Sequence, residues 1–379
     1  MGCADSLRSA CSFTTQPFIT DISKMANGYC PPSRFYSLVG QAGVALFFMI
    51  TGYLFWGRMI AERGRPDWIQ LYTGRIFRIG PLYLFALAVM LLIVFQRTGF
   101  KLHVPLPSLA TELIRWSILG FGDGPDVNGY KTVPLLGGTW TLSYEWRFYF
   151  SLIIIAFAAR DNRTHLPFAA VGLAVSLSYL LFINPDSTCA SCTALFSVGM
   201  LCASLERRGL TPVLPDGTSS VVILGLLAMV MLTSSRIYAA GPIIQLGGAF
   251  FLIISGANLF GLLSSRPARR LGDVSYGIYL LQGLVMTLVF ASDSVRMFAL
   301  GSPTQHWATM GACSIILLFV SAVTHVGIER VGIDFGKRVY VALESVRKGR
   351  LFSQMTFPHR LLLLQSKLPH RWRNRKPPG

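Results

Sequence analysis

The chain has 379 residues, of which 52% are hydrophobic and only 13% are charged, and its net charge is +17. This composition is too apolar for a soluble domain of that length. Many of its apolar runs approach the roughly 20 residues that cross a membrane as a helix, and they lack the alternation of a transmembrane β-barrel. We therefore predict an all-α polytopic membrane protein.

Nine apolar segments are predicted to span the membrane, and the fifth, with its polar Ser-Cys-Thr start, is the least secure. In chain order they cover residues 38–58, 79–96, 139–158, 166–183, 189–204, 219–235, 240–262, 273–292 and 307–327. They define a membrane domain at 37–332, preceded by a polar segment (1–36) and followed by a basic tail (333–379).

Charge predicts the orientation of these spans. One set of loops, together with the tail, holds 24 of the 34 Lys and Arg residues, whereas the opposite side holds nine. Basic loops stay in the cytoplasm, so we expect a cytoplasmic C-terminus and an external N-terminus. Because residues 1–36 contain neither a signal peptide nor a span, we expect a first helix to be missing. Basic charge confined to one face fits topology and anionic lipids, and we expect no nucleic-acid partner.

The segment with the clearest chemistry is residues 137–149, which place Glu145 in an otherwise apolar stretch. A carboxylate in a membrane helix is costly and usually functional. Glu145 is expected near the outer end of its span, where it could take a proton from a hydroxyl group or orient a base. The alternative is a buried ion pair. Arg147 is an unsuitable partner because the two side chains point about 100° apart on a helix.

Two arginines, Arg75 and Arg78, lie three residues apart on one helix face at the predicted cytoplasmic side. Guanidinium groups there can bind phosphate in bidentate fashion. The alternative is that they only fix the topology.

The outer loop at about 97–133 contains an amphipathic stretch at 109–116 and a turn-rich acidic stretch at 120–126. It could cover an acceptor site from outside the membrane. Equally, it could be an interfacial helix followed by a linker.

Four stretches of sequence, with a short closing motif, share the order and spacing of a known family. They read Gly-Val-Ala-Leu-Phe-Phe-Met-Ile-Thr-Gly (43–52), Arg-Ile-Phe-Arg-Ile-Gly-Pro-Leu-Tyr (75–83), Thr-Trp-Thr-Leu-Ser-Tyr-Glu-Trp-Arg-Phe-Tyr (139–149) and Leu-Gly-Asp-Val-Ser-Tyr-Gly-Ile-Tyr-Leu (271–280), closing with Ile-Glu-Arg (328–330). Over about 38–332 the chain thus resembles the membrane-bound acyltransferase 3 family, which usually has ten helices.

The resemblance implies transfer of an acyl group from coenzyme A to a hydroxyl, commonly on a cell-surface carbohydrate. The expected co-substrate is acyl-CoA, foremost acetyl-CoA, with no tightly bound cofactor and no metal. The expected surroundings are the lipid bilayer of a bacterial inner membrane and a carbohydrate acceptor. The sequence does not predict the oligomeric state.

The resemblance also implies roles for individual residues. Glu145 is the expected catalytic residue. The expected donor-binding residues are Arg75, Arg78, Ser275, Tyr276 and Tyr279, and the expected substrate-binding residues are Trp140, Ser143 and Tyr149. For the tyrosines of 271–280 the alternative is packing. For the aromatic residues of 139–149 it is an interfacial anchor, and for the serine a bond to its own preceding turn.

The chain departs from the family pattern at several positions. The family carries its expected catalytic histidine in the first helix, but no histidine here precedes His103. Gln282 stands at a position where many relatives have a second histidine. His103 and His325 are the candidate substitutes. Glu329 and Arg330 are expected as an ion-pair site at the cytoplasmic end of the last span. Two alternatives to an active enzyme follow: an inactive relative that binds glycan or lipid, or a small-molecule transporter.

Overall fold

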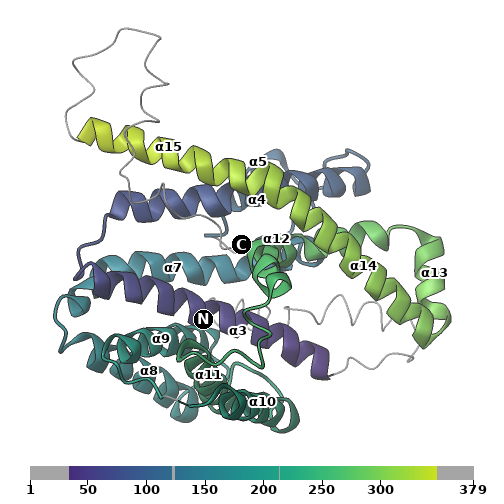
Figure 1. Cartoon of the computed structure of the whole chain (residues 1–379). Helices are drawn as coiled ribbons and strands as arrows, with labels where there is room; N and C mark the ends of the chain where they lie inside the picture. The colour runs from purple at the N-terminus through teal and green to yellow at the C-terminus, as the bar shows by residue number, and fades with distance from the viewer. Residues whose placement is uncertain (1–33, 122–123, 213, 348–379) are drawn as a thin grey trace.

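The computed structural model describes residues 34–121, 124–212 and 214–347 as a bundle of helices that run roughly side by side (Figure 1). Eight described helices or helical segments are long and apolar enough to cross a membrane, which confirms the predicted all-α polytopic class. The seventh predicted span, 240–262, falls on a shorter helix, Ala240–Ile254. The main helices are α3 (Arg34–Ala61), α4 (Trp68–Arg97), α5 (Leu106–Ser117), α6 (Val133–Leu136), α7 (Trp140–Ile155), α8 (His165–Phe182), α9 (Thr188–Arg207), α10 (Asp216–Thr233), α11 (Ala240–Ile254), α12 (Arg266–Val289), α13 (Asp293–Gly301), α14 (Pro303–Thr324) and α15 (Arg330–Arg347).

The turns at 62–67, 160–164 and 255–265, together with residues 208–212 after α9, lie at one side of the bundle. This side, which we call the basic side, carries most of the loop arginines. Most of the predicted N-terminal segment lies outside the described residues, as does the end of the tail.

The backbones of α3 and α9 approach each other closely where the two helices cross. A Cβ atom on Gly52 would lie 2.3 Å from the Phe196 carbonyl oxygen, and one on Gly199 would lie 2.0 Å from the Met49 carbonyl oxygen. Small residues allow membrane helices to pack this tightly. The glycine at the end of the 43–52 motif is therefore a packing requirement.

Replacing Gly52 by alanine should destabilise the protein by about 1–3 kcal/mol, because backbone atoms of α9 cannot move aside as a flexible side chain could. Thermal unfolding in detergent, followed by tryptophan fluorescence, measures the change. Gly43→Ala is the matched control in the same helix, since nothing lies within 4 Å of its added Cβ. Equal melting temperatures for the two variants would contradict the close crossing.

The loop between α4 and α6 contains α5 and packs against both α4 and α7. The Tyr83 hydroxyl, halfway along α4, donates to the Trp116 carbonyl (2.7 Å), and the Trp146 indole donates to the Leu119 carbonyl (3.0 Å). Leu119 and Gly120 have φ values of 55° and 79°. Irregular backbone at membrane depth needs such protein partners. The hydrophobic periodicity of the sequence does not predict these hydrogen bonds between loop and helices.

The last helix is longer than predicted. α14 passes through a π-helical turn, η3 (His325–Glu329), into α15, and together they form the long rod that runs from the upper left (α15) down to the right (α14) in Figure 1. α15 lies along the first half of α4: a Cβ on Gly332 would meet Pro81 at 2.5 Å, and the Tyr340 hydroxyl donates to Asp67 (3.0 Å). Glu329 is buried and Arg330 is exposed, and the helix continues past both residues to Arg347. The boundary drawn at 332 falls within the helix.

Candidate functional site

The site is built around a buried carboxylate on α7. Glu145 is 3% exposed and Tyr149, four residues later on the same face, is 0% exposed. The Tyr149 hydroxyl donates to Glu145 Oε1. The helical segment that contains them runs from Val133 to Ala159, so Glu145 lies near its middle. The short α6 and a 3₁₀ turn precede α7, so Glu145 lies farther from the start of the helical segment than the span predicted from the sequence implies.

Two arginines of α4 supply positive charge next to this carboxylate. The guanidinium carbon of Arg75 lies 4.2 Å from the ring centroid of Phe55 and 5.6 Å from that of Tyr149. Arg75 and Arg78 both act electrostatically on Glu145. A buried carboxylate is tolerated only with such compensation, and the two aromatic faces hold the Arg75 guanidinium in place by cation–π contacts.

The same arginines line a cavity of about 310 Å³, which we call the arginine pocket. Its lining residues come mainly from α3 and α4 and are Leu54, Phe55, Arg58, Gln70, Leu71, Gly74, Arg75, Arg78 and Ile333. Arg58 donates from Nη2 to Gln70 Oε1 (2.8 Å). Three guanidinium groups around one cavity suit a phosphate-bearing ligand.

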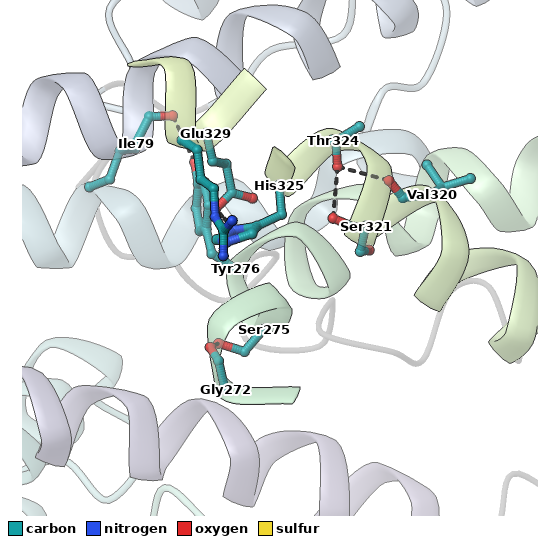
Figure 2. A network of polar contacts seen from close by, with 10 residues as sticks. Ile79, Gly272, Ser275, Tyr276, Val320, Ser321, Thr324, His325 and Glu329 are labelled. Atoms are coloured by element: carbon teal, nitrogen blue, oxygen red, sulfur yellow. Dashed lines mark hydrogen bonds and ion pairs between the residues drawn. The ribbon is translucent and has the colours of Figure 1, made fainter. Parts of the chain in front are cut away.

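The two predicted tyrosines of α12 reach the same region through backbone contacts. The Tyr276 hydroxyl donates to the Ile79 carbonyl (3.0 Å), and the Tyr279 hydroxyl donates to the Gly138 carbonyl (2.9 Å). They fix α12 against α4 and the start of α7. The predicted Ser275 is exposed and donates to Gly272 (2.8 Å), so it does not join them (Figure 2).

The predicted substrate-binding residues divide between the faces of α7. Tyr149 lies with Glu145. Trp140 lies on another face, in edge-on contact with Tyr144 and Tyr238 at centroid distances of 5.8 and 6.3 Å. The Ser143 hydroxyl points to the loop between α4 and α6 and donates to the Phe121 carbonyl (3.4 Å). The structure thus brings Tyr149, but neither Trp140 nor Ser143, to the carboxylate.

Arg147 lies over the Tyr144 ring, with 5.1 Å between its guanidinium carbon and the ring centroid. The described contacts of Glu145 involve Tyr149, Arg75 and Arg78. This arrangement agrees with the prediction that Arg147 is not the ion-pair partner of Glu145.

A second polar cluster occupies the π-helical turn of the last helix (Figure 2). Arg330 donates from Nε to His325 Nε2 (3.3 Å), and His325 Nδ1 lies 3.1 Å from Glu329 Oε2. Because arginine can only donate, His325 carries its proton on Nδ1 and donates it to Glu329. The positive charge of Arg78 is close enough to favour the ionised form of both Glu329 and Glu145, although it forms no salt bridge with either among the described residues. π-Turns often occur at functional sites, but their sequences carry no signature that would have predicted this one.

The two candidate substitute histidines have different surroundings. His325 is partly buried in the cluster just described. His103 is exposed in the loop after α4, where its ring Nε2 lies 3.3 Å from the Thr98 carbonyl oxygen. Thr98 caps the end of α4 opposite the basic side, and the Arg75 and Arg78 positions lie near the other end.

Replacing His325 by leucine should cost about 3–5 kcal/mol of stability, because Glu329 is 3% exposed and would lose its hydrogen-bonded partner. The double variant His325→Leu/Glu329→Leu should recover most of that loss, since it also removes the buried charge. Thermal unfolding of wild type, both single variants and the double variant gives the coupling energy. Additive losses would show that the pair does not act as a unit.

Comparison with known proteins gives the family. The sequence profile described as an acyltransferase domain, that of the acyltransferase 3 family, matches residues 13–326. The exopolysaccharide production protein ExoZ of Rhizobium meliloti (strain 1021) is 25% identical over 287 residues, which cover 73% of this chain and 86% of the relative. No solved structure matches the chain significantly. Because the profile spans most of the sequence and its apolar helices, the chain belongs to the membrane-bound acyltransferase 3 family.

Proposed function

We propose that the protein transfers an acyl group, foremost acetyl, from acyl-CoA to a hydroxyl of an extracytoplasmic or lipid-linked carbohydrate. The observation that carries the proposal is the buried Glu145–Tyr149 pair beside the arginine pocket. The Glu145 carboxylate suits the role of proton acceptor, and the arginine pocket suits the phosphate groups of the acyl donor. The name of the relative ExoZ supports a polysaccharide acceptor.

In this mechanism Arg75 and Arg78 bind phosphate of the donor and direct its thioester toward Glu145. The acceptor hydroxyl oxygen attacks the thioester carbonyl carbon, an oxygen ester forms and the carbon–sulfur bond breaks. Glu145 takes the hydroxyl proton and passes it to the departing thiolate, giving free coenzyme A thiol. Tyr149 holds one carboxylate oxygen and thereby fixes the direction of the other. The excess of basic residues on the arginine side supports donor entry from the cytoplasm, in a bacterial inner membrane with the C-terminus inside.

The experiment is an acyl-transfer assay with the full chain in liposomes. Acetyl-CoA is supplied on the basic side, a panel of lipid-linked oligosaccharides serves as acceptors, and both thiol release and acylated product are measured. Acceptor-dependent thiol release supports the proposal. Acceptor binding without thiol release from any donor would favour an inactive glycan-binding relative. Flux of a solute without donor would favour a transporter.

A further inference from the structure

A second cavity lies beside the arginine pocket at the basic side. It has a volume of about 470 Å³ and is lined by Ala61, Glu62, Arg63, Arg65 and Arg160. We call it the turn pocket, because four of these residues belong to the end of α3 and its following turn. Three guanidinium groups meet there, and none forms a salt bridge with an acidic side chain of the described residues. The proposed mechanism leaves this pocket without a role.

The backbone of the turn pocket is tightly packed at Gly64. Gly64 has a φ of 67°, and a Cβ on it would lie 2.3 Å from the Ala156 carbonyl oxygen and 2.8 Å from Arg160 Cγ. Arg63 also has a positive φ, 51°, which is uncommon for a residue with a side chain. The turn is thus pressed against the end of the α7 segment, and Arg160 is brought next to Arg63 and Arg65.

A single ion pair separates the two pockets. Arg58 lines the arginine pocket, Glu62 lines the turn pocket, and Arg58 Nε donates to Glu62 Oε1 (2.9 Å) across one turn of α3. Residues four apart on a helix have Cβ atoms about 6 Å from each other. The second carboxylate oxygen, Glu62 Oε2, is buried and has no hydrogen-bond partner among the described residues. It can therefore accept a hydrogen bond from a ligand.

Two adjacent arginine-lined cavities, with the unpaired Glu62 Oε2 between them, fit a nucleotide with two separate phosphate groups. Coenzyme A has this chemistry, since its ribose carries a pyrophosphate on the 5′ carbon, a phosphomonoester on the 3′ carbon and a hydroxyl on the 2′ carbon. We propose that the turn pocket binds the 3′-phosphate of the acyl-CoA donor through Arg63, Arg65 and Arg160. Glu62 Oε2 accepts from the 2′-hydroxyl, while the pyrophosphate occupies the arginine pocket. This inference rests on the proposed function.

The test compares coenzyme A with 3′-dephospho-coenzyme A by titration calorimetry, using the full chain in nanodiscs of phosphatidylcholine. Binding is measured without turnover. Wild type should bind coenzyme A about 10- to 100-fold more tightly, as expected for charge-assisted hydrogen bonds to one phosphate. The variant Arg63→Gln/Arg65→Gln/Arg160→Gln should bind the two ligands within about twofold of each other, with its affinity for the dephospho ligand unchanged. Arg207→Gln/Arg266→Gln is the matched control on the same side and should discriminate as wild type does.

Equal binding of the two ligands by wild type would overturn the inference, as would a triple variant that weakens both ligands equally. A lipid headgroup in the same pocket is distinguished by repeating the titration with phosphatidylglycerol in the nanodisc. If the effect of the triple variant appears only with that anionic lipid, the pocket binds lipid and the inference fails. If wild type binds coenzyme A more tightly than the dephospho ligand but transfers no acyl group, the assignment of the turn pocket stands and the proposed reaction is rejected.

Discussion

Replacing Glu145 by glutamine should lower kcat for acyl transfer by about 10²- to 10⁴-fold, the usual contribution of a positioned general base. Glutamine keeps the size of the side chain and can still accept the Tyr149 hydrogen bond, so the buried site should remain folded. What it loses is the ability to take the proton of the acceptor hydroxyl. The KM for the donor should change little, because Arg75 and Arg78 still bind phosphate.

The control is Asp334→Asn, which removes an exposed carboxylate paired with Lys337 (2.7 Å) and should leave kcat unchanged. Tyr149→Phe is a milder variant, since it keeps the Glu145 carboxylate but removes the hydrogen bond to one of its oxygens. We expect a smaller loss of kcat for Tyr149→Phe than for Glu145→Gln. If the glutamine variant kept full activity while His325→Leu lost it in a folded protein, the proton acceptor would be His325.

Replacing Arg75 by lysine should raise the KM for acyl-CoA by about tenfold or more, although the charge is conserved. The guanidinium carbon lies over the Phe55 ring at 4.2 Å, and a planar guanidinium binds phosphate through two parallel donors. Lysine provides a compact point charge that neither stacks on the ring in this way nor binds phosphate through two parallel hydrogen bonds. Because phosphate binding is made in the ground state as well as the transition state, kcat should fall less than the KM rises.

Arg207→Lys is the matched control, since Arg207 ends α9 on the basic side and lines neither pocket. Its KM should equal that of wild type. A large fall in kcat at unchanged KM for Arg75→Lys would instead place Arg75 at the reacting atoms. That result would move the thioester carbonyl close to the guanidinium.

Much of the helical architecture was predictable from hydropathy. Each of the nine predicted spans falls on a helix, including the doubtful fifth, which is the well-buried α9. The spacing of Arg75 and Arg78, and of Glu145 and Tyr149, also predicts that each pair shares a helix face. The structure adds that the two faces lie next to each other.

The remaining features depend on tertiary contacts that no local pattern encodes. Trp116 and Leu119 are held against α4 and α7 by hydrogen bonds that Tyr83 and Trp146 donate to their carbonyl groups. Trp140 and Ser143 belong to the family-like motif with Glu145, but the helix turns them to other faces. The charged stretch after residue 329 suggested the end of the membrane domain, yet Gly332 packs against Pro81 and the helix continues.

The continuous last helix has a consequence for how the protein responds to its lipids. Its 43 residues from Pro303 to Ser345 span about 64 Å at 1.5 Å per residue, roughly twice the thickness of the hydrocarbon core of a bilayer. Such a helix must tilt or project from the membrane, and its tilt depends on bilayer thickness. Its π-turn, which contains Glu329, lies near the middle of this length. We therefore expect lipids of different acyl-chain length to change the tilt of the helix that carries Glu329.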